Sequence, residues 1–266
     1  MRIRLIAVDV DGTLLNSRKE LTRPVADAIR AVKEHGILFT IATGRDVLGL
    51  RRFAHLLSGE VPVITYNGAV IRRAGSGEVI SETCLPEPTA LEVIHQGLER
   101  GFSVIVWSRG ALYIGQAGAF SEGYSDMYGI RERELAGYAD LAKQGVTKVI
   151  WAGDPAVIGK LESSMKTAPI AGSESSTSDP SYLEFMAEGV NKGAGLQTAA
   201  HALGLNASEV MAVGDGHNDL PMLRWAGRSV AMGNADPEVK AEADFVTGSC
   251  DHDGLAEALL ALLEGE

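Results

Sequence analysis

Short apolar runs alternate with helical patterns in the first 66 residues, and this alternation restricts the possible folds more than any other feature of the chain. Residues 3–8, 37–42 and 61–66 are short and largely apolar, as expected of strands that are buried on both faces. Residues 22–36 and 46–57 lie between these runs and are predicted to be helices. Strands and helices that follow one another with short connections predict a parallel sheet with right-handed crossovers.

The middle of the chain has a different pattern. Residues 71–83 are predicted to form a hairpin, and a helix is expected to follow it up to about residue 101. Further on, helical stretches are mixed with strands in hairpin-like pairs. The Ser-rich segment 173–181 is predicted to be a loop, with short strands at 169–174 and 182–186. This mixture is typical of an α+β unit rather than of a parallel sheet.

The first pattern resumes after about residue 187 and continues towards the C-terminus. We therefore predict an α/β fold with a doubly wound, mostly parallel sheet as its core. Residues 1–83 and 188–266 would form this core, and residues 84–187 would form an inserted α+β domain. A chain of 266 residues is long enough for a large domain with such an insert.

Charge and cysteine content narrow the range of partners. The chain has 24 basic and 35 acidic residues, and this net charge of −11 repels nucleic acids and anionic membranes. Two cysteines without a CxxC pair argue against a structural zinc site and favour a cytoplasmic protein. No apolar stretch approaches the roughly 18 residues that a membrane span needs. We expect neither a nucleic-acid nor a membrane partner, and the sequence leaves the oligomeric state open.

Polar residues follow the predicted core strands at the points where the strands end. Ligands of open parallel sheets bind outside the carboxyl ends of the strands, so these residues are the candidates for chemistry. In chain order they are Asp9, Asp11, Gly12 and Thr13, then Thr43, Gly44 and Arg45, then Asn67 and Gly68, and finally the segment from Gly214 to Asp219.

Several of these residues are carboxylates. Asp9 and Asp11 are two residues apart, and strand periodicity points both side chains the same way. Asp215 and Asp219 follow a later strand. Carboxylates gathered at one sheet edge repel one another, and a divalent cation is the natural compensation. Ligands that are all oxygen favour Mg²⁺, which also accepts a substrate phosphate as a ligand.

A phosphoryl site also needs a hydroxyl or amide donor and a cation, and Thr43 and Lys192 supply these groups. Taken singly, Thr43 fits a helix N-cap better than a catalytic residue, and Lys192 fits a solvated helix start, so their value comes from the set. His217 fits a polar loop residue better than a general base, because Asp11 already fills that role.

Four motifs in chain order resemble the haloacid dehalogenase superfamily of phosphatases. They are Asp9-Val10-Asp11-Gly12-Thr13-Leu14, Thr43-Gly44-Arg45, Lys192-Gly193 and Gly214-Asp215-Gly216-His217-Asn218-Asp219. The large insert between the second and third motifs is similar to that of the Cof-like branch, whose insert is an α+β cap. Tyr66-Asn67-Gly68-Ala69 and Met232-Gly233-Asn234-Ala235 also resemble stretches that are common in this branch.

The resemblance implies a Mg²⁺-dependent phosphatase that forms an aspartyl phosphate on Asp9. Asp11 would protonate the leaving alcohol and then deprotonate the attacking water. Mg²⁺ would be held by the carboxylates of Asp9 and Asp215 and by the backbone carbonyl of Asp11.

The same resemblance implies roles for the other motif residues. Thr43 and Lys192 would hold the phosphoryl oxygens, and Asn218 and Asp219 would orient Lys192 or a metal-bound water. The residues implied at the substrate are Gly44, Arg45 and Asn218.

The implied substrate is a small phosphorylated metabolite, with sugar phosphates first and pyridoxal phosphate or flavin mononucleotide behind them. The inserted domain would close over the site and supply the leaving-group pocket, for which Arg109, Tyr113 and Glu184 are candidates without an assigned role. A phosphomutase of the same superfamily would carry the same motifs. A non-catalytic phosphometabolite-binding protein is disfavoured, because such a descendant should have lost Asp9, Asp11 or Lys192.

Overall fold

The computed structural model describes residues 2–46, 48–128 and 130–265. The chain divides into two compact units, which we call the core unit and the insert unit. The core unit comprises Met1–Gly44, Arg51–Ser81 and Asn191–Glu266, and the insert unit comprises Arg45–Leu50 and Glu82–Val190.

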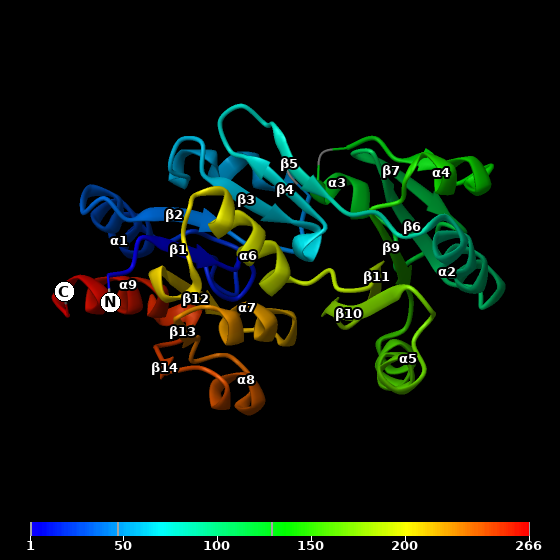
Figure 1. Cartoon of the computed structure of the whole chain (residues 1–266). Coiled ribbons are helices and arrows are strands. Elements are labelled where there is room, and N and C mark those ends of the chain that lie inside the picture. The colour runs from blue at the N-terminus through cyan, green and yellow to red at the C-terminus, as the bar shows by residue number, and fades with distance from the viewer. Residues whose placement is uncertain (1, 47, 129, 266) are drawn as a thin grey trace. The chain divides into compact units, whose positions relative to one another are not determined.

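A five-stranded parallel sheet forms the centre of the core unit, with the strand order β14-β13-β12-β1-β2 (Figure 1). Its strands are β1 (Leu5–Val8), β2 (Leu38–Ile41), β12 (Val210–Gly214), β13 (Arg228–Ala231) and β14 (Phe245–Val246). Strand β1 lies between β2 and β12 and pairs with both, so the N-terminal and C-terminal parts of the chain meet within one sheet. The predicted fold class, an α/β protein with a mostly parallel core sheet, is confirmed.

Helices of the core unit pack in two groups. Helix α1 packs against α9, and α6 packs against α7 (Figure 1). The helices are α1 (Arg23–Glu34), α6 (Lys192–Ala202), α7 (Leu220–Trp225), α8 (Pro237–Ala241) and α9 (Gly254–Glu264), and the 3₁₀ helices are η1 (Leu48–Leu56), η2 (Tyr66–Gly68), η3 (Ala207–Glu209), η4 (His217–Asp219) and η5 (Cys250–His252).

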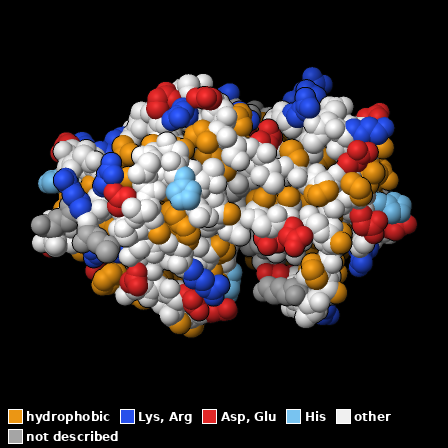
Figure 2. All heavy atoms as spheres, in the orientation of Figure 1, with side chains coloured by type: hydrophobic (Ala, Val, Ile, Leu, Met, Phe, Trp, Pro, Cys, Tyr) orange, Lys and Arg blue, Asp and Glu red, His pale blue; other side chains and the backbone are white. Residues whose placement is uncertain are grey.

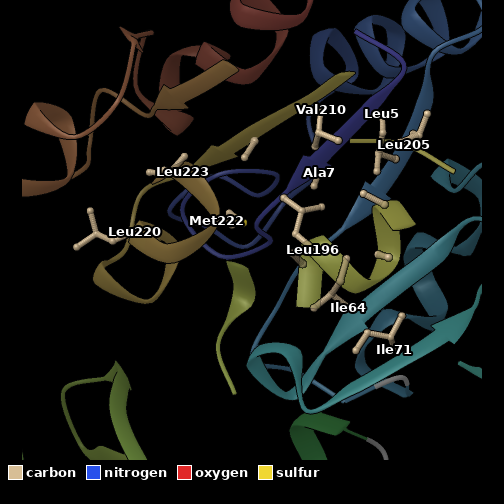
Figure 3. Packing of buried hydrophobic residues seen from close by; sticks show 14 of the residues in the cluster. Leu5, Ala7, Ile64, Ile71, Leu196, Leu205, Val210, Leu220, Met222 and Leu223 are labelled. Carbon is tan, nitrogen blue, oxygen red and sulfur yellow. The ribbon is translucent and has the colours of Figure 1, made fainter. Parts of the chain in front are cut away.

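Strand alternation accounts for the two layers of helices. Leu5 and Ala7 of β1 lie in a buried cluster with Leu196 of α6 and Met222 of α7, which Figure 3 shows. Ile6, which alternates with them, is equally buried on the opposite face of the sheet. Both faces of the sheet are therefore apolar, as the short apolar runs of the sequence predict.

The predicted strand at 61–66 only partly extends the parallel sheet. Strand β3 (Pro62–Thr65) touches the end of β2 through a single parallel bridge between Ala42 and Ile64, and it pairs antiparallel with β4 (Val70–Arg73). Strand β5 (Val79–Glu82) completes this small sheet. The hairpin predicted at 71–83 corresponds to β4 and β5, with the Arg73 N–H donating to the Glu78 carbonyl across the turn.

The predicted helix at 46–57 is instead the 3₁₀ helix η1, and residue 47 lies outside the described residues. The Asp46 side chain accepts a hydrogen bond from the Gly49 N–H at 2.7 Å. This contact has the pattern of an N-cap hydrogen bond at the start of the segment, while glycine near that start disfavours a regular α-helix.

The insert unit contains a six-stranded sheet with the order β10-β11-β9-β6-β7-β8, antiparallel except between β7 and β8 (Figure 1). Its strands are β6 (Ser103–Ser108), β7 (Ala111–Gly115), β8 (Arg133–Glu134), β9 (Lys148–Ala152), β10 (Ser173–Asp179) and β11 (Tyr182–Ala187), and its helices are α2 (Glu87–Glu99), α3 (Tyr124–Tyr128), α4 (Tyr138–Gln144) and α5 (Pro155–Thr167). Alternating residues of the strands pack against α2 and α5, among them Val104, Trp151 and Phe185.

The loop predicted at 173–181 is wrong, because Ser173–Asp179 forms strand β10. This strand pairs antiparallel with β11 from Ser173↔Ala187 to Asp179↔Tyr182. Backbone hydrogen bonds hold an edge strand whatever its side chains are, and polar side chains are tolerated at an edge. The strand predicted at 169–174 is correct only at residues 173–174, which begin β10, since a turn at residues 171–172 precedes them.

Among the described residues, no helix has the length and the apolar character that crossing a membrane requires. Acidic and basic side chains are intermixed on the face drawn in Figure 2, so positive charge is not gathered there into one surface.

Candidate active site

Asp9 is a buried carboxylate directly after strand β1. Its N–H donates to the Val213 carbonyl at 3.0 Å, and its own carbonyl accepts from the Leu14 N–H. The backbone is thus fixed between β1 and β12 where the two strands end. Only 6% of the residue is exposed, and its Oδ1 accepts a hydrogen bond from Lys192 Nζ at 2.5 Å.

Lys192 is the first residue of α6, yet its side chain is buried rather than solvated. The Asn191 side chain caps the helix by accepting from the Ala194 N–H at 2.9 Å. Lys192 Nζ lies 2.5 Å from Asp9 Oδ1 and 2.6 Å from Asp219 Oδ1. A single ammonium group therefore bridges carboxylates that are distant in the sequence.

Both carboxylate oxygens of Asp219 are occupied within the protein. Oδ1 accepts from Lys192, and Oδ2 accepts from the backbone N–H groups of Asp215 at 3.0 Å and Gly216 at 2.9 Å. Asp219 thereby fixes the loop after β12 and the position of the lysine. An aspartate used in this way is better suited to orienting Lys192 than to binding a metal directly.

Asp215 is held by neighbours on both carboxylate oxygens. Thr13 Oγ1 donates to Oδ1 at 2.9 Å, and Asn234 Nδ2 donates to Oδ2 at 3.1 Å. Gly12, with φ of 85°, passes so close that a Cβ there would collide with the same carboxylate. Only glycine fits this conformation and this approach, which explains its place in the first motif.

The crowding of these acids changes their proton affinity. Burial and the nearby carboxylates of Asp219 and Asp215 raise the pKa of Asp9 to about 8, although Lys192 acts in the opposite direction. Burial and Asp219 raise the pKa of Asp215 to about 6. Burial alone would lower the pKa of Lys192, but Asp219 and Asp9 outweigh it and raise that pKa above its usual value.

These residues fit a divalent cation. Asp9, Asp215 and Asp219 each offer a carboxylate oxygen, and the three atoms lie within 4.8 Å of one another. Three carboxylates around one ammonium group leave an excess of negative charge in a buried place. A hard cation with oxygen ligands relieves such an excess. Asp219 is fixed by Lys192 and by two backbone N–H groups of its own loop, whereas Asp215 is held by two side chains and lies partly exposed. The carboxylates of Asp9 and Asp215 are therefore the better placed to bind it.

Asp11 lies outside this group of carboxylates as far as the described residues show. Its side chain is 38% exposed, and Oδ1 forms an ion pair with Lys19 Nζ at 2.9 Å. The side chain of Asp11 is therefore accessible, as a group that exchanges protons with substrate and water must be.

The second motif follows β2 at the same sheet edge as Asp9. Strand β2 pairs with β1 so that Ile41 lies opposite Val8, and Thr43 and Gly44 follow after Ala42. Thr43 is buried, its N–H donates to Ile64, and its carbonyl accepts from Asn67. Arg45 groups with the insert unit, so its role at the substrate stays a prediction.

The loop after β12 contains Asn218, which is implied at the substrate, and His217, which fits a polar loop residue better than a general base. Asn218 Nδ2 donates to Asn67 Oδ1 at 3.2 Å. The His217 ring is about half exposed and lies near two acidic side chains, Glu238 at 3.1 Å and Asp236 at 3.7 Å. His217 is thus a polar loop residue at the surface.

Three residues of this site were not assigned a role from the sequence: Thr13, Asn67 and Asn234. Thr13 and Asn234 hold Asp215, while Asn67 holds Asn218 and the Thr43 carbonyl. All three lie in stretches that resemble family motifs, and this resemblance is the sequence signal that points to them. Their hydrogen-bond partners are distant in the sequence, so spacing alone could not reveal their roles.

Comparison with known proteins agrees with this geometry. The sequence profile of the haloacid dehalogenase-like hydrolase family matches residues 6–259. The HMP-PP phosphatase of Klebsiella pneumoniae is 31% identical over 266 residues, which cover 98% of this chain and 96% of that protein. A second relative is the 5-amino-6-(5-phospho-D-ribitylamino)uracil phosphatase YcsE of Bacillus subtilis, 31% identical over 97% of this chain and 94% of its own length.

A solved structure is similar over the same extent. The haloacid dehalogenase-like hydrolase from Bacteroides thetaiotaomicron aligns with a TM-score of 0.84 and 28% identity, covering 98% of this chain and 100% of that one. The chain belongs to the haloacid dehalogenase-like hydrolase family. The predicted resemblance is confirmed, and so is the predicted enzyme class, a hydrolase of the phosphatase type.

Proposed function

We propose that this enzyme hydrolyses a small phosphorylated metabolite with the help of Mg²⁺, through an aspartyl phosphate on Asp9. One observation carries the proposal: the nucleophile candidate Asp9 shares a buried cluster with Lys192, Asp219 and Asp215, which come from other segments of the chain. A buried excess of carboxylates is costly to maintain and is typical of functional sites.

Asp9 would attack the phosphorus atom with a carboxylate oxygen and release the alcohol, and water would then hydrolyse the acyl phosphate. Lys192, already 2.5 Å from Asp9 Oδ1, would stabilise the negative charge of the transferred group. Asp11 would protonate the leaving oxygen and later accept a proton from the attacking water. Its accessible carboxylate supports this role.

Asp9, Asp215 and the Asp11 backbone carbonyl would hold Mg²⁺, which supplies charge neutralisation between the nucleophile and the phosphate when it is bound. Thr13 and Asn234 would keep Asp215 oriented for this purpose. Thr43, Gly44 and Asn218 would line the phosphoryl group. Metal ligands that are held by further hydrogen bonds keep their orientation, which favours binding.

We propose further that residues 84–187 form the cap of this enzyme and supply the leaving-group pocket, together with Arg45. The two relatives are named for an HMP-PP substrate and a ribitylaminouracil phosphate, both small phosphorylated metabolites. For this chain a sugar phosphate is our first choice of substrate, and its identity would depend on the insert unit.

The test is phosphate release by the purified protein from an aryl phosphate and a panel of phosphorylated metabolites. We expect activity with Mg²⁺, loss of activity with EDTA, and recovery when Mg²⁺ is restored. Asp9→Asn should lower turnover at least about 1,000-fold with the fold intact, because the nucleophile is lost.

The matched control is Asp140→Asn, which changes an exposed aspartate of α4 and should leave turnover unchanged. Full activity of Asp9→Asn would rule out Asp9 as the nucleophile, and full activity after chelation would rule out the metal. Isomer formation without phosphate release would instead identify a mutase.

A further inference from the structure

The turn between β3 and β4 has a backbone conformation that is unusual for residues other than glycine. Tyr66, Asn67 and Gly68 are consecutive residues with φ of 50°, 53° and 102°. Left-handed backbone conformations are unfavourable for residues other than glycine, and Asn tolerates them better than most other residues. All three residues are buried. Such a conformation persists only where its surroundings require it, and it is often found at functional sites.

Asn67 holds the segment that follows β2. Its N–H donates to the Thr43 carbonyl at 2.9 Å. Its side-chain amide lies against Gly44, where an added Cβ would be 3.1 Å from Asn67 Oδ1. The backbone and the side chain of Asn67 thus contact both residues that are proposed to line the phosphoryl group from this side.

The same turn contacts two other motifs. Asn67 Oδ1 accepts from Asn218 Nδ2 at 3.2 Å, in the loop after β12. Gly68 packs so closely against the start of α6 that a Cβ there would collide with the Asn191 carbonyl. Asn191 is the cap of α6 and directly precedes Lys192. The turn therefore lies against the second and fourth motifs and against the residue that directly precedes the third.

We propose that Asn67 is a positioning residue for phosphoryl transfer, which sets the relative placement of Thr43, Gly44 and Asn218. This inference rests on the proposed function, because these three residues line the phosphoryl group only if that function is correct. Asn67 combines what the position needs: tolerance of a left-handed backbone, a backbone N–H, and a side-chain acceptor for Asn218. Glycine would keep the first two properties and lose the third.

The variant Asn67→Gly separates a positioning role from a merely structural one. It relieves backbone strain and removes the amide, so we expect a melting temperature close to that of the wild type. We expect kcat to fall about 10- to 100-fold with KM changed less than about threefold, because misplaced groups impair the reaction more than ground-state binding. The matched control is Gln116→Gly at an exposed left-handed position of the insert unit, with unchanged kinetics expected.

A double-mutant cycle with Asn218→Ala identifies the partner. If Asn67 acts through Asn218, the two losses in kcat should be non-additive, with the double variant little worse than the more damaged single variant. Should Asn67→Gly fail to fold, Asn67→Ala replaces it, since alanine also removes the side-chain acceptor for Asn218 and keeps the backbone N–H. A kcat within threefold of the wild type in the folded variant would overturn the inference, and so would fully additive losses.

A second readout distinguishes this failure from failure of the proposed function. Orthovanadate with Mg²⁺ should raise the melting temperature of the wild type, and it should raise that of Asn67→Gly by less. An active wild type with an equally active and equally stabilised variant would overturn the role of Asn67 alone. A wild type that neither releases phosphate nor responds to vanadate would overturn both proposals.

Discussion

Two lysines whose burial the structure describes are almost completely buried, and their surroundings differ in one decisive respect. In the insert unit, Lys148 lies 3.0 Å from Glu184, and both residues are at most 3% exposed. In the core unit, Lys192 is equally buried but bridges Asp9 and Asp219, with the carboxylate of Asp215 close to both. The first lysine belongs to a pair that is neutral, and the second lies in a cluster with an excess of acid.

This difference distinguishes a buried ion pair with a structural role from buried charged residues that can take part in a reaction. A neutral pair needs no further ion, and replacing it with apolar residues often costs little. An acidic excess must bind protons or a cation, and the raised pKa values of Asp9 and Asp215 express this need. We therefore assign chemistry to the cluster around Lys192 and a structural role to the Lys148–Glu184 pair.

Replacing the core lysine should have the largest effect. Lys192→Met removes the side-chain cation that bridges Asp9 and Asp219, so the transferred phosphoryl group loses its stabilising charge. We expect kcat/KM to fall about 1,000-fold in saturating Mg²⁺. Phosphate release measures the loss, and circular dichroism verifies that the variant is folded.

The control for this variant is Lys160→Met, which changes an exposed lysine of α5. It should leave both kinetics and stability unchanged. A Lys192→Met variant that is folded and keeps more than a tenth of the wild-type kcat/KM would remove Lys192 from the mechanism and weaken the comparison.

Replacing the lysine of the insert unit should affect stability instead. Lys148→Met leaves Glu184 buried without its partner in the 3.0 Å pair, and we expect a loss of about 3 kcal/mol in the free energy of unfolding. The double variant Lys148→Met/Glu184→Leu should recover most of this loss, since apolar side chains can replace a buried pair. Chemical denaturation of both variants measures the two values.

The double variant also tests whether the pair is only structural. With the pair removed, kcat and the preference among the phosphorylated metabolites of the panel should stay as in the wild type. A stable double variant with an altered substrate preference would break the comparison, because the pair would then contribute to the leaving-group pocket.

The main features of the fold were predictable because they depend on local patterns. Apolar runs and helical spacing gave the strands and helices of the core sheet, whose partners follow from general rules of parallel sheets. The errors occur where tertiary context decides. Ser173–Asp179 is a strand because β11 offers it a hydrogen-bonding edge, and β3 turns away from the core sheet to pair with β4. Neither partner could be seen in the local sequence.

The candidate site likewise has residues that the sequence identifies and contacts that it does not. Asp9, Lys192 and Asp215 were identifiable because the chemistry needs their residue types and the motifs give their order. The sequence could not show that Asp219 uses both oxygens on internal partners, or that Lys19 pairs with Asp11. These contacts depend on atomic placement across the sheet edge, and residue type alone does not determine it.

The smallest effect that we predict concerns pH. In the metal-free protein, Asp9 and Asp215 have pKa values of about 8 and about 6, above the usual value of 3.8. Between pH 5 and pH 8 the folded protein therefore holds more protons than the unfolded chain, and its stability falls as the pH rises. Glu209 and Asp251, whose pKa values are lowered by hydrogen bonds, titrate below this window.

Bound Mg²⁺ should reverse this trend, since it requires the ionised carboxylates. We expect the difference in melting temperature between Mg²⁺-saturated and EDTA-treated protein to be at least about 3 °C larger at pH 8 than at pH 5. Asp215→Asn should reduce the difference, because it removes one of the two acids. The neutral pair in the insert unit binds no cation in this scheme, so Lys148→Met/Glu184→Leu should keep the full difference. A metal-free protein that is as stable at pH 8 as at pH 5 would show that the acidic excess is already compensated within the chain, and the contrast between the two lysines would lose its basis.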